Sequence, residues 1–152
     1  MYSRQEESSL RQQFWTNFGQ YLKPVPSSTG NQVNWINYKT GVKPVNFKMD
    51  AGRGQAYIGI EISHKDTEKR KLFFNQFKLL KQGLENITEE KWEWEETVVV
   101  EGRTISRIYT MISAVNINKQ EDWPGIISFL KKRIIALDRF WNENNDIFEM
   151  MA

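Results

Sequence analysis

The sequence predicts an α+β domain, with a mainly antiparallel sheet of about five strands and helices packed on it. Two stretches alternate apolar and polar residues on both sides of a turn, which is typical of β-hairpins with one buried face. Three other stretches repeat apolar residues every three or four positions, as amphipathic helices do. The predicted order is α-β-β-β-α-β-β-α. The chain has 152 residues, the length of one domain, which we expect to span residues 1–152.

The first helix is expected from about residue 4 to 22, where a proline-rich stretch ends it. Its apolar stripe consists of Leu10, Phe14, Phe18 and Tyr21, and Trp15 is expected to pack at the stripe's edge. A short strand is predicted from Val33 to Tyr38, because this segment is rich in β-formers and precedes the turn signal Lys39-Thr40-Gly41.

The stretch from Val45 to Ser63 is the clearest hairpin of the chain. Its turn, Ala51-Gly52-Arg53-Gly54, contains two glycines that accept positive φ at little cost, and it is expected to place Asp50 near Gln55. A polar site on the sheet would use the face opposite the core. The core rows are Val45, Phe47 and Met49 on one strand and Ile58, Ile60 and Ile62 on the other; the opposite face carries Asn46, Lys48, Tyr57 and Glu61.

The next helix is expected to begin at a capping residue, either Asp66 or Thr67. Its apolar stripe extends over about four turns and consists of Phe73, Phe77, Leu80, Leu84 and Ile87. Basic residues decorate the same helix, namely Lys65, Lys69, Arg70, Lys71, Lys78 and Lys81. Such a run is typical of a solvated face. The alternative is a contact with nucleic acid, in which Lys69, Arg70 and Lys78 would bind phosphates.

A second hairpin is predicted from Trp92 to Ile112, with Glu101-Gly102 as its two-residue turn. That turn predicts four cross-strand pairs, which are Val100 with Arg103, Val98 with Ile105, Glu96 with Arg107, and Trp94 with Tyr109.

The last helix is expected to start with Asp122 as its cap and Pro124 in its first turn, and to run to about residue 148. Its apolar stripe comprises Ile127, Leu130, Ile134, Leu137 and Trp141.

Composition removes several classes of site. There is no cysteine, which excludes disulfides, thiolate nucleophiles and cysteine-bound zinc. The single histidine, His64, is predicted to be a surface or capping residue. No cofactor is indicated.

The polar N-terminus and the lack of a long apolar run favour a soluble, cytoplasmic protein without membrane partners. The net charge of +2 is smaller than a dedicated nucleic-acid binder usually shows.

One catalytic arrangement is worth testing, a divalent-metal site of the restriction-endonuclease type. That fold's core runs helix, three strands, helix, strand, which the first part of the predicted order matches. Its chemistry needs an Asp near one strand and a Glu-x-Lys on the next, and the equivalents here are Asp50 and Glu61-Ile62-Ser63. Ser63 stands where the lysine is needed. The predicted turn also leaves Glu61 about 20 Å along the strand from Asp50, so this site is only an alternative.

Short motifs along the chain resemble an uncharacterised bacterial family of domains of unknown function. The resemblance covers about residue 12 to 145 and rests on Trp15, Tyr21-Leu22, Ile58-Gly59-Ile60-Glu61-Ile62, Lys71-Leu72-Phe73-Phe74, Phe77, Lys81, Trp92-Glu93-Trp94-Glu95, Ser106-Arg107-Ile108 and Glu121-Asp122-Trp123-Pro124. Members of this family commonly follow a domain that resembles a restriction-type nuclease. The resemblance implies a shared surface at Glu61, Lys81, Trp94, Arg107 and Trp123, and no catalytic residues.

We therefore predict a non-catalytic binding or accessory domain associated with nucleic acid or with restriction-type nucleases. A divergent Mg²⁺-dependent nuclease using Asp50 and Glu61 is the first alternative. The second alternative is a protein–protein interaction or homo-oligomerisation module. Convergence of Asp50 with Glu61 would favour the nuclease, and clustering of Lys and Arg on one face would favour nucleic-acid binding.

Overall fold

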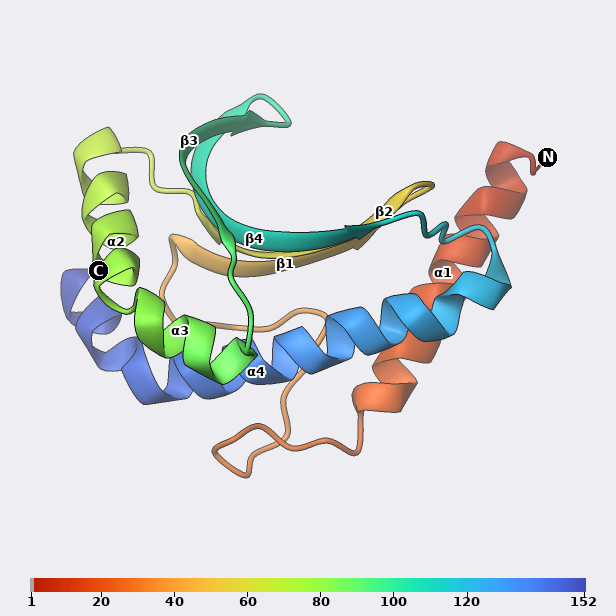
Figure 1. Ribbon diagram of the computed structural model, residues 1–152, viewed down its shortest axis with the longest axis horizontal. Helices are drawn as coiled ribbons and strands as arrows, with labels where there is room; N and C mark the ends of the chain where they lie inside the picture. The colour runs from red at the N-terminus through yellow and green to blue at the C-terminus, as the bar shows by residue number, and fades with distance from the viewer. Residues whose placement is uncertain (1) are drawn as a thin grey trace.

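The computed structural model describes residues 2–152, which form an α+β domain with one four-stranded antiparallel sheet (Figure 1). The strands lie in the order β1-β2-β4-β3. The elements are α1 (Arg4–Leu22), β1 (Val45–Ala51), β2 (Gln55–Ile62), α2 (Thr67–Leu79), α3 (Lys81–Thr88), β3 (Glu93–Val100), β4 (Arg103–Ser113), a 3₁₀ turn η1 (Gln120–Asp122) and α4 (Trp123–Met151).

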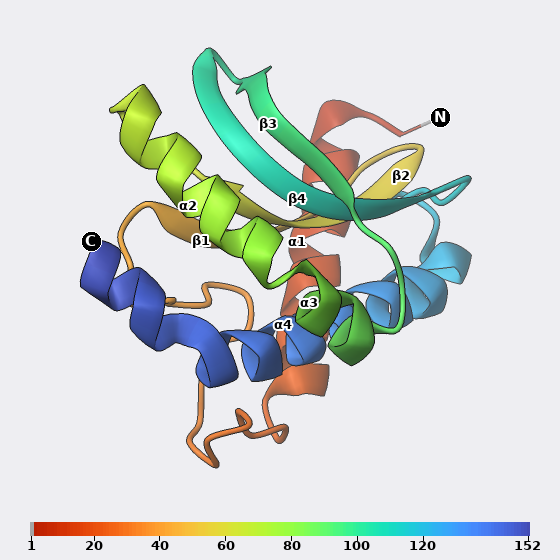
Figure 2. The ribbon, with the colours of Figure 1, turned by 60° about the vertical axis from the view of Figure 1, so that its left-hand side comes forward.

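The sheet is strongly curved, and the helices cover only one of its faces (Figures 1 and 2). Helix α4 runs along the covered face, α1 crosses near its N-terminal end, and α2 lies beside its C-terminal end. Within residues 2–152 no helix lies on the other face, which we call the open sheet face. It carries Tyr57, Gly59 and Glu61 from β2, Glu95 from β3, and Arg107 and Tyr109 from β4.

The β1–β2 hairpin has the predicted faces. Val45 pairs with Ile62, Phe47 with Ile60, and Met49 with Ile58, so these rows point toward the core. The turn differs from the prediction, because Asp50 pairs with Tyr57 rather than lying near Gln55. Neither glycine of the turn uses positive φ. The left-handed glycines among the described residues are Gly30, Gly41 and Gly102.

The β3–β4 hairpin keeps the predicted register only near its turn. Glu101 and Gly102 both have positive φ, and the pairs Val100–Arg103 and Val98–Ile105 are confirmed. A β-bulge between Glu95 and Val98 then shifts the register by one residue. The predicted pairs Glu96–Arg107 and Trp94–Tyr109 are therefore wrong. The observed pairs are Glu95–Arg107, Trp94–Ile108 and Glu93–Tyr109, and the Ser106 hydroxyl donates to the Glu96 carbonyl within the bulge.

The predicted strand from Val33 to Tyr38 is wrong, so the sheet has four strands rather than five. Side chains hold this segment as an irregular loop. The Asn34 amide oxygen accepts from the Asn37 N–H, and the buried Trp35 indole donates to the Val25 carbonyl. Such local bonds compete with ladder pairing. Only two strands precede α2, so the restriction-endonuclease order of three strands between the helices is not met.

Helix α1 has the predicted bounds, and Phe14 and Phe18 are buried in the core, with Trp15 packed against it. Tyr21 is 62% exposed, and Leu22 takes its place in the core.

The predicted second helix is divided at Leu80, whose φ of −101° and ψ of 8° interrupt the helical hydrogen bonding, so α2 and α3 are separate. Asp66 caps α2 as predicted, accepting from the N–H groups of Glu68 and Lys69. Asp122 is the N-cap residue of α4 and Pro124 lies in its first turn, as predicted, but the Asp122 side chain makes no capping hydrogen bond. Its carboxylate accepts instead from the Asn116 N–H, and η1 leads into the helix.

The core has an aromatic centre where α2 meets α4. The rings of Phe77 and Phe148 lie 4.3 Å apart between their centroids, and Trp141 stacks on Phe77 and packs at a tilt against Phe148. All three are buried. Of the helices in residues 2–152, none combines the length and apolar character that crossing a membrane requires.

Candidate functional site

The centre of the open sheet face is an aromatic pair built over a glycine. Tyr57 on β2 and Tyr109 on β4 stack with their ring centroids 5.5 Å apart. Gly59 lies one pleat along from Tyr57 and pairs with Tyr109. A Cβ at Gly59 would lie 2.5 Å from the Tyr57 hydroxyl and 2.9 Å from the Tyr109 Cβ. The absence of a side chain at Gly59 therefore lets both rings lie down on the sheet.

Two of the residues predicted for a shared surface, Glu61 and Arg107, meet at this aromatic pair. They are direct partners across β2 and β4. The Tyr57 hydroxyl donates to Glu61 at 3.0 Å, and the Arg107 guanidinium lies 4.3 Å from the Tyr109 ring centroid. Arg107 also donates to Glu95 at 2.7 Å. The result is a connected network of two carboxylates, one guanidinium and two phenol rings.

Burial and the two carboxylates change the acidity of this network. Burial is the largest cause raising the pKa of Tyr57, and the charge and hydrogen bond of Glu61 raise it further against the opposing effect of Arg107. For Arg107, burial alone would lower the pKa, but the hydrogen bond to Glu95 and the charges of Tyr57 and Glu95 raise it above its ordinary value. The phenol is thus held neutral and the guanidinium charged.

Asp50 and Glu61 do not converge. Asp50 pairs with Tyr57, so Glu61 lies four residues further along β2, about 13 Å at the usual strand rise. Asp50 is also exposed and 3.9 Å from Arg11 of α1, whereas Glu61 accepts from Tyr57. In residues 2–152 no three His, Asp or Glu side chains gather as a metal site would require. The arrangement therefore lacks the carboxylate pair that a restriction-type nuclease needs.

The other residues predicted for the shared surface, Lys81, Trp94 and Trp123, lie away from the open sheet face. Lys81 lies with its Nζ 5.8 Å from the Trp94 ring centroid, so these two predicted residues do meet. Trp123 is elsewhere, buried at the start of α4 with its indole donating to the Ile117 carbonyl. Trp94 faces the core side of the sheet against Phe74. The five residues predicted for a shared surface therefore form two separate pairs and one core anchor.

The basic residues around α2 differ in exposure. Lys69 and Lys78 face solvent, and Lys78 lies 5.0 Å from the Phe74 ring centroid. Arg70 is only 4% exposed, and its Nε donates to the buried Ser106 hydroxyl of β4. Arg70 therefore links α2 to the sheet and is not presented to a ligand, although sequence spacing alone could not separate it from its neighbours.

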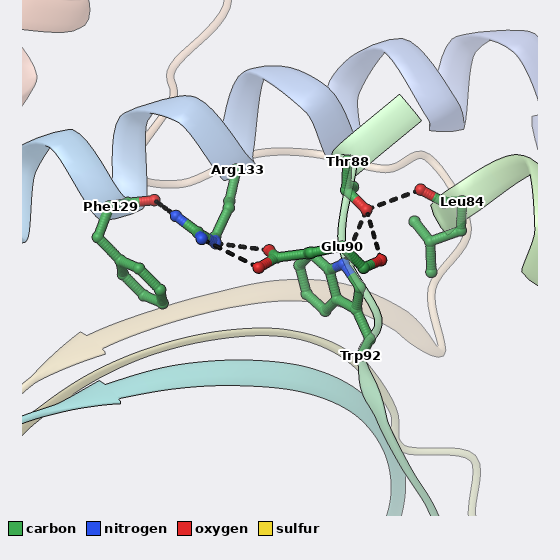
Figure 3. A network of polar contacts seen from close by, with 6 residues as sticks. All are labelled: Leu84, Thr88, Glu90, Trp92, Phe129 and Arg133. Carbon is green, nitrogen blue, oxygen red and sulfur yellow. Dashed lines mark hydrogen bonds and ion pairs between the residues drawn. The ribbon is translucent and has the colours of Figure 1, made fainter. Parts of the chain in front are cut away.

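Sequence reasoning missed a polar junction between α3, β3 and α4 (Figure 3). Arg133 of α4 binds Glu90 with both ends of its guanidinium, at 2.6 and 3.0 Å, and donates to the Phe129 carbonyl. Beside it, the Trp92 indole donates to the Thr88 hydroxyl, which donates to the Leu84 carbonyl. This junction fixes the entry of the chain into β3, next to the bulge.

A second missed cluster surrounds Asp138, which is buried within α4. Its carboxylate accepts from the Ser27 hydroxyl, the Ser28 N–H, the Tyr38 hydroxyl at 2.6 Å and the Asn142 amide. Burial, followed by the hydrogen bond and charge of Asp138, raises the pKa of Tyr38. The available signal was an aspartate on the apolar face of the last helix, four residues after Ile134 and three before Trp141. The cluster ties the irregular loop to α4 and is structural.

Comparison with known proteins places the chain in a family without assigning an activity. No curated protein and no solved structure gives a significant match. A family model described as "Domain of unknown function (DUF4268)" matches residues 10–145. The match runs from α1 into α4 and includes the open sheet face and α2. The chain therefore belongs to the DUF4268 family of domains of unknown function.

Proposed function

We propose that this protein is a non-catalytic nucleic-acid-binding domain that contacts the phosphate backbone through the lysines around α2. One observation carries the proposal. The α2 lysines have no carboxylate partner within residues 2–152, where all five ion pairs use arginine. These α2 lysines are Lys65, Lys69, Lys71, Lys78 and Lys81.

The charge is concentrated at this helix. Between residues 64 and 81 there are six basic and two acidic side chains, a net of four positive charges, whereas the whole chain has a formal net charge of +2. The rest of the chain is therefore net negative. A local excess of unpaired lysines is the electrostatic footprint of phosphate binding, because each contact releases condensed counterions.

The open sheet face is the less suitable surface for a polyanion. Its carboxylates, Glu61 and Glu95, outnumber its guanidinium, and Arg107 is already paired with Glu95. Asp50 and Glu93 add further negative charge at its two edges, and Lys48 on β1 offsets only one of these charges. Like charges facing phosphates would weaken binding there. Contact between the nucleic acid and the lysines around α2 avoids this repulsion.

The test is binding of short single-stranded and duplex DNA and RNA, measured by fluorescence anisotropy over a salt series. We expect weak affinity at low salt that falls steeply between roughly 50 and 200 mM salt. The variant K69Q/K78Q should lower the affinity for every sequence and reduce the salt slope by about two, one per lost phosphate contact.

The matched control is Lys119→Gln. Lys119 is an exposed lysine in the turn before η1. The segment that leads into the start of α4 lies at the opposite end of the molecule from α2 (Figure 1). We expect K119Q to bind like the unmodified protein. Absence of binding at low salt, or equal losses in K119Q and K69Q/K78Q, would overturn the proposal.

A protein partner is the second candidate function, favoured by two leucines on the outer face of α2. Leu72 is 59% exposed and Leu79 is 80% exposed, and they lie seven residues apart on one side of the helix. If they anchor a partner, L72S/L79S abolishes association while leaving nucleic-acid binding unchanged. If nucleic acid is the ligand, K69Q/K78Q lowers binding more than L72S/L79S does.

A further inference from the structure

A basic hollow lies where the end of β2, the start of α2 and the end of α4 meet. Its volume is about 480 Å³. Three lysines, the only histidine and one serine line it: Lys43, Lys65, Lys69, His64 and Ser63. No acidic side chain lines it, and none of its lysines forms an ion pair among the described residues.

The β1–β2 ladder places the first of these groups together. The Ser63 N–H donates to the Pro44 carbonyl, which extends the pairing by one residue beyond Val45–Ile62. Lys43 precedes Pro44 in the turn from Val42 to Val45, which the Val45 N–H closes on the Val42 carbonyl just before β1. A cation and an imidazole from distant parts of the chain therefore line the same hollow.

The α2 N-terminus supplies the rest. The Asp66 N–H donates to His64 Nδ1 at 3.0 Å, so the neutral imidazole carries its proton on Nε2 and can donate from there. The Asp66 carboxylate, two residues after His64, is engaged in capping α2. Lys69 and Phe73 are four residues apart and share one face of the helix. The buried Phe73 ring and Met151 give the hollow an apolar wall beneath its cations.

We infer that this hollow binds the phosphomonoester of a nucleotide. A terminal phosphate carries a charge between about −1.5 and −2 near neutral pH and three acceptor oxygens, which matches three ammonium groups and the Nε2–H donor. The volume falls within the range of small-molecule sites, about 300–1,000 Å³, so it admits the attached sugar and base beside the apolar wall. The phosphate has two sources, a free mononucleotide or the end of a strand, and the second source rests on the proposed nucleic-acid function.

The experiment compares competitors against an internally labelled oligonucleotide. Strands of one sequence ending in 5′-hydroxyl, 5′-phosphate or 3′-phosphate are titrated in parallel, and adenosine monophosphate is titrated separately by calorimetry. We expect one phosphorylated end to bind about five- to ten-fold more tightly than the hydroxyl end, as exposed charge-assisted contacts allow. K43Q and H64Q should abolish that preference, and K119Q should keep it.

The outcomes separate the two proposals. Preference for a phosphorylated strand end assigns the strand as the source, and saturable binding of adenosine monophosphate that K43Q removes assigns the free nucleotide. If strands with all three ends bind with equal affinity and adenosine monophosphate does not bind, the hollow is not a phosphomonoester site. The proposed nucleic-acid function then still stands. Each variant should have the same thermal unfolding temperature as the unmodified protein. A loss of binding is then not a loss of fold.

Discussion

Gly59 shows how one residue shapes the open sheet face. The two tyrosine rings occupy the space that a side chain there would need, and a Cβ would approach the Tyr57 hydroxyl to 2.5 Å. We predict that Gly59→Ala lowers the free energy of unfolding by about 1–3 kcal/mol through overpacking, as measured by chemical denaturation. The double variant Gly59→Ala/Tyr57→Phe should lose less free energy of unfolding than the sum of the two single variants, because the contact with the Tyr57 hydroxyl is gone.

Gly83 is the matched control for that substitution. It lies within α3, and a Cβ there would meet nothing within 4 Å. Gly83→Ala should therefore stabilise the protein by roughly 0.4–1 kcal/mol, since alanine has less freedom to lose in the unfolded chain. Equal effects at both positions would contradict the packing described at Gly59.

The buried tyrosines predict how stability depends on alkaline pH. The folded-state pKa of Tyr57 is raised, so its neutral phenol stabilises the protein fully below the unfolded value of about 10, and this stability is lost as the pH rises above that value. We expect the free energy of unfolding to fall between pH 9 and 11, and to fall less steeply in Tyr57→Phe. A slope unchanged by Tyr57→Phe would show that Tyr57 ionises equally in the folded and unfolded chain.

Among the elements, the β3–β4 hairpin shows where sequence patterns lose accuracy. The Glu101-Gly102 turn correctly sets the first pairs, because both residues adopt the positive φ that a primed turn needs. The bulge depends on tertiary contacts, including the Ser106 hydroxyl and the buried Arg70 that reaches it from α2. The alternation of apolar and polar residues does not depend on those contacts, so it could not predict the bulge. The observed pairs beyond the bulge are therefore displaced by one residue from the predicted pairs.

That displacement can be measured. A double-mutant cycle on Glu95 and Arg107 should give a coupling of a few tenths to about 1 kcal/mol, as expected for a partly exposed cross-strand ion pair. The same cycle on Glu96 and Arg107 serves as the control and should give a coupling near zero. A larger coupling for Glu96 would restore the unshifted register.

The contact between α2 and α4 is an aromatic part of the core. Phe77 is fully buried between Trp141 and Phe148, so Phe77→Ala should cost about 3–5 kcal/mol in the free energy of unfolding. Leu79 on the same helix faces solvent, and Leu79→Ala should change stability by no more than about 0.5 kcal/mol. Chemical denaturation of both variants checks the pair, and a loss below about 1 kcal/mol for Phe77→Ala would contradict the packing.

For the whole molecule, hairpin periodicity and helical stripes were sufficient to predict the α+β class and most element bounds. They were insufficient for the segment from Val33 to Tyr38, where β-forming residues serve as anchors for a loop: Trp35 donates to Val25, and Tyr38 donates to the buried Asp138. For the candidate site, the family resemblance named Glu61 and Arg107, but their contact depends on the pairing of β2 with β4, which alternation within a strand does not determine. The hollow at His64 likewise requires β2, α2 and α4 to be assembled.

The separation of Asp50 from Glu61 predicts that the domain does not cleave nucleic acid. Incubation with plasmid and single-stranded substrates in Mg²⁺ or Mn²⁺ should leave them intact, because the two carboxylates lie too far apart to share a metal ion. Cleavage that disappears in Glu61→Gln and Asp50→Asn variants would contradict this prediction. Contaminating nuclease would be unaffected by those substitutions.

Helix α4, from Trp123 to Met151, supplies about a third of the buried apolar residues and covers the sheet that all earlier strands form. During synthesis, the ribosome releases β1 to β4 before this helix exists. At about 5–20 residues per second, a nascent chain therefore spends seconds with the apolar rows of β2 and β4 uncovered. This protein is thus expected to depend on ribosome-associated chaperones, and slowing translation at the codons of α4 should lower its soluble yield in the cell.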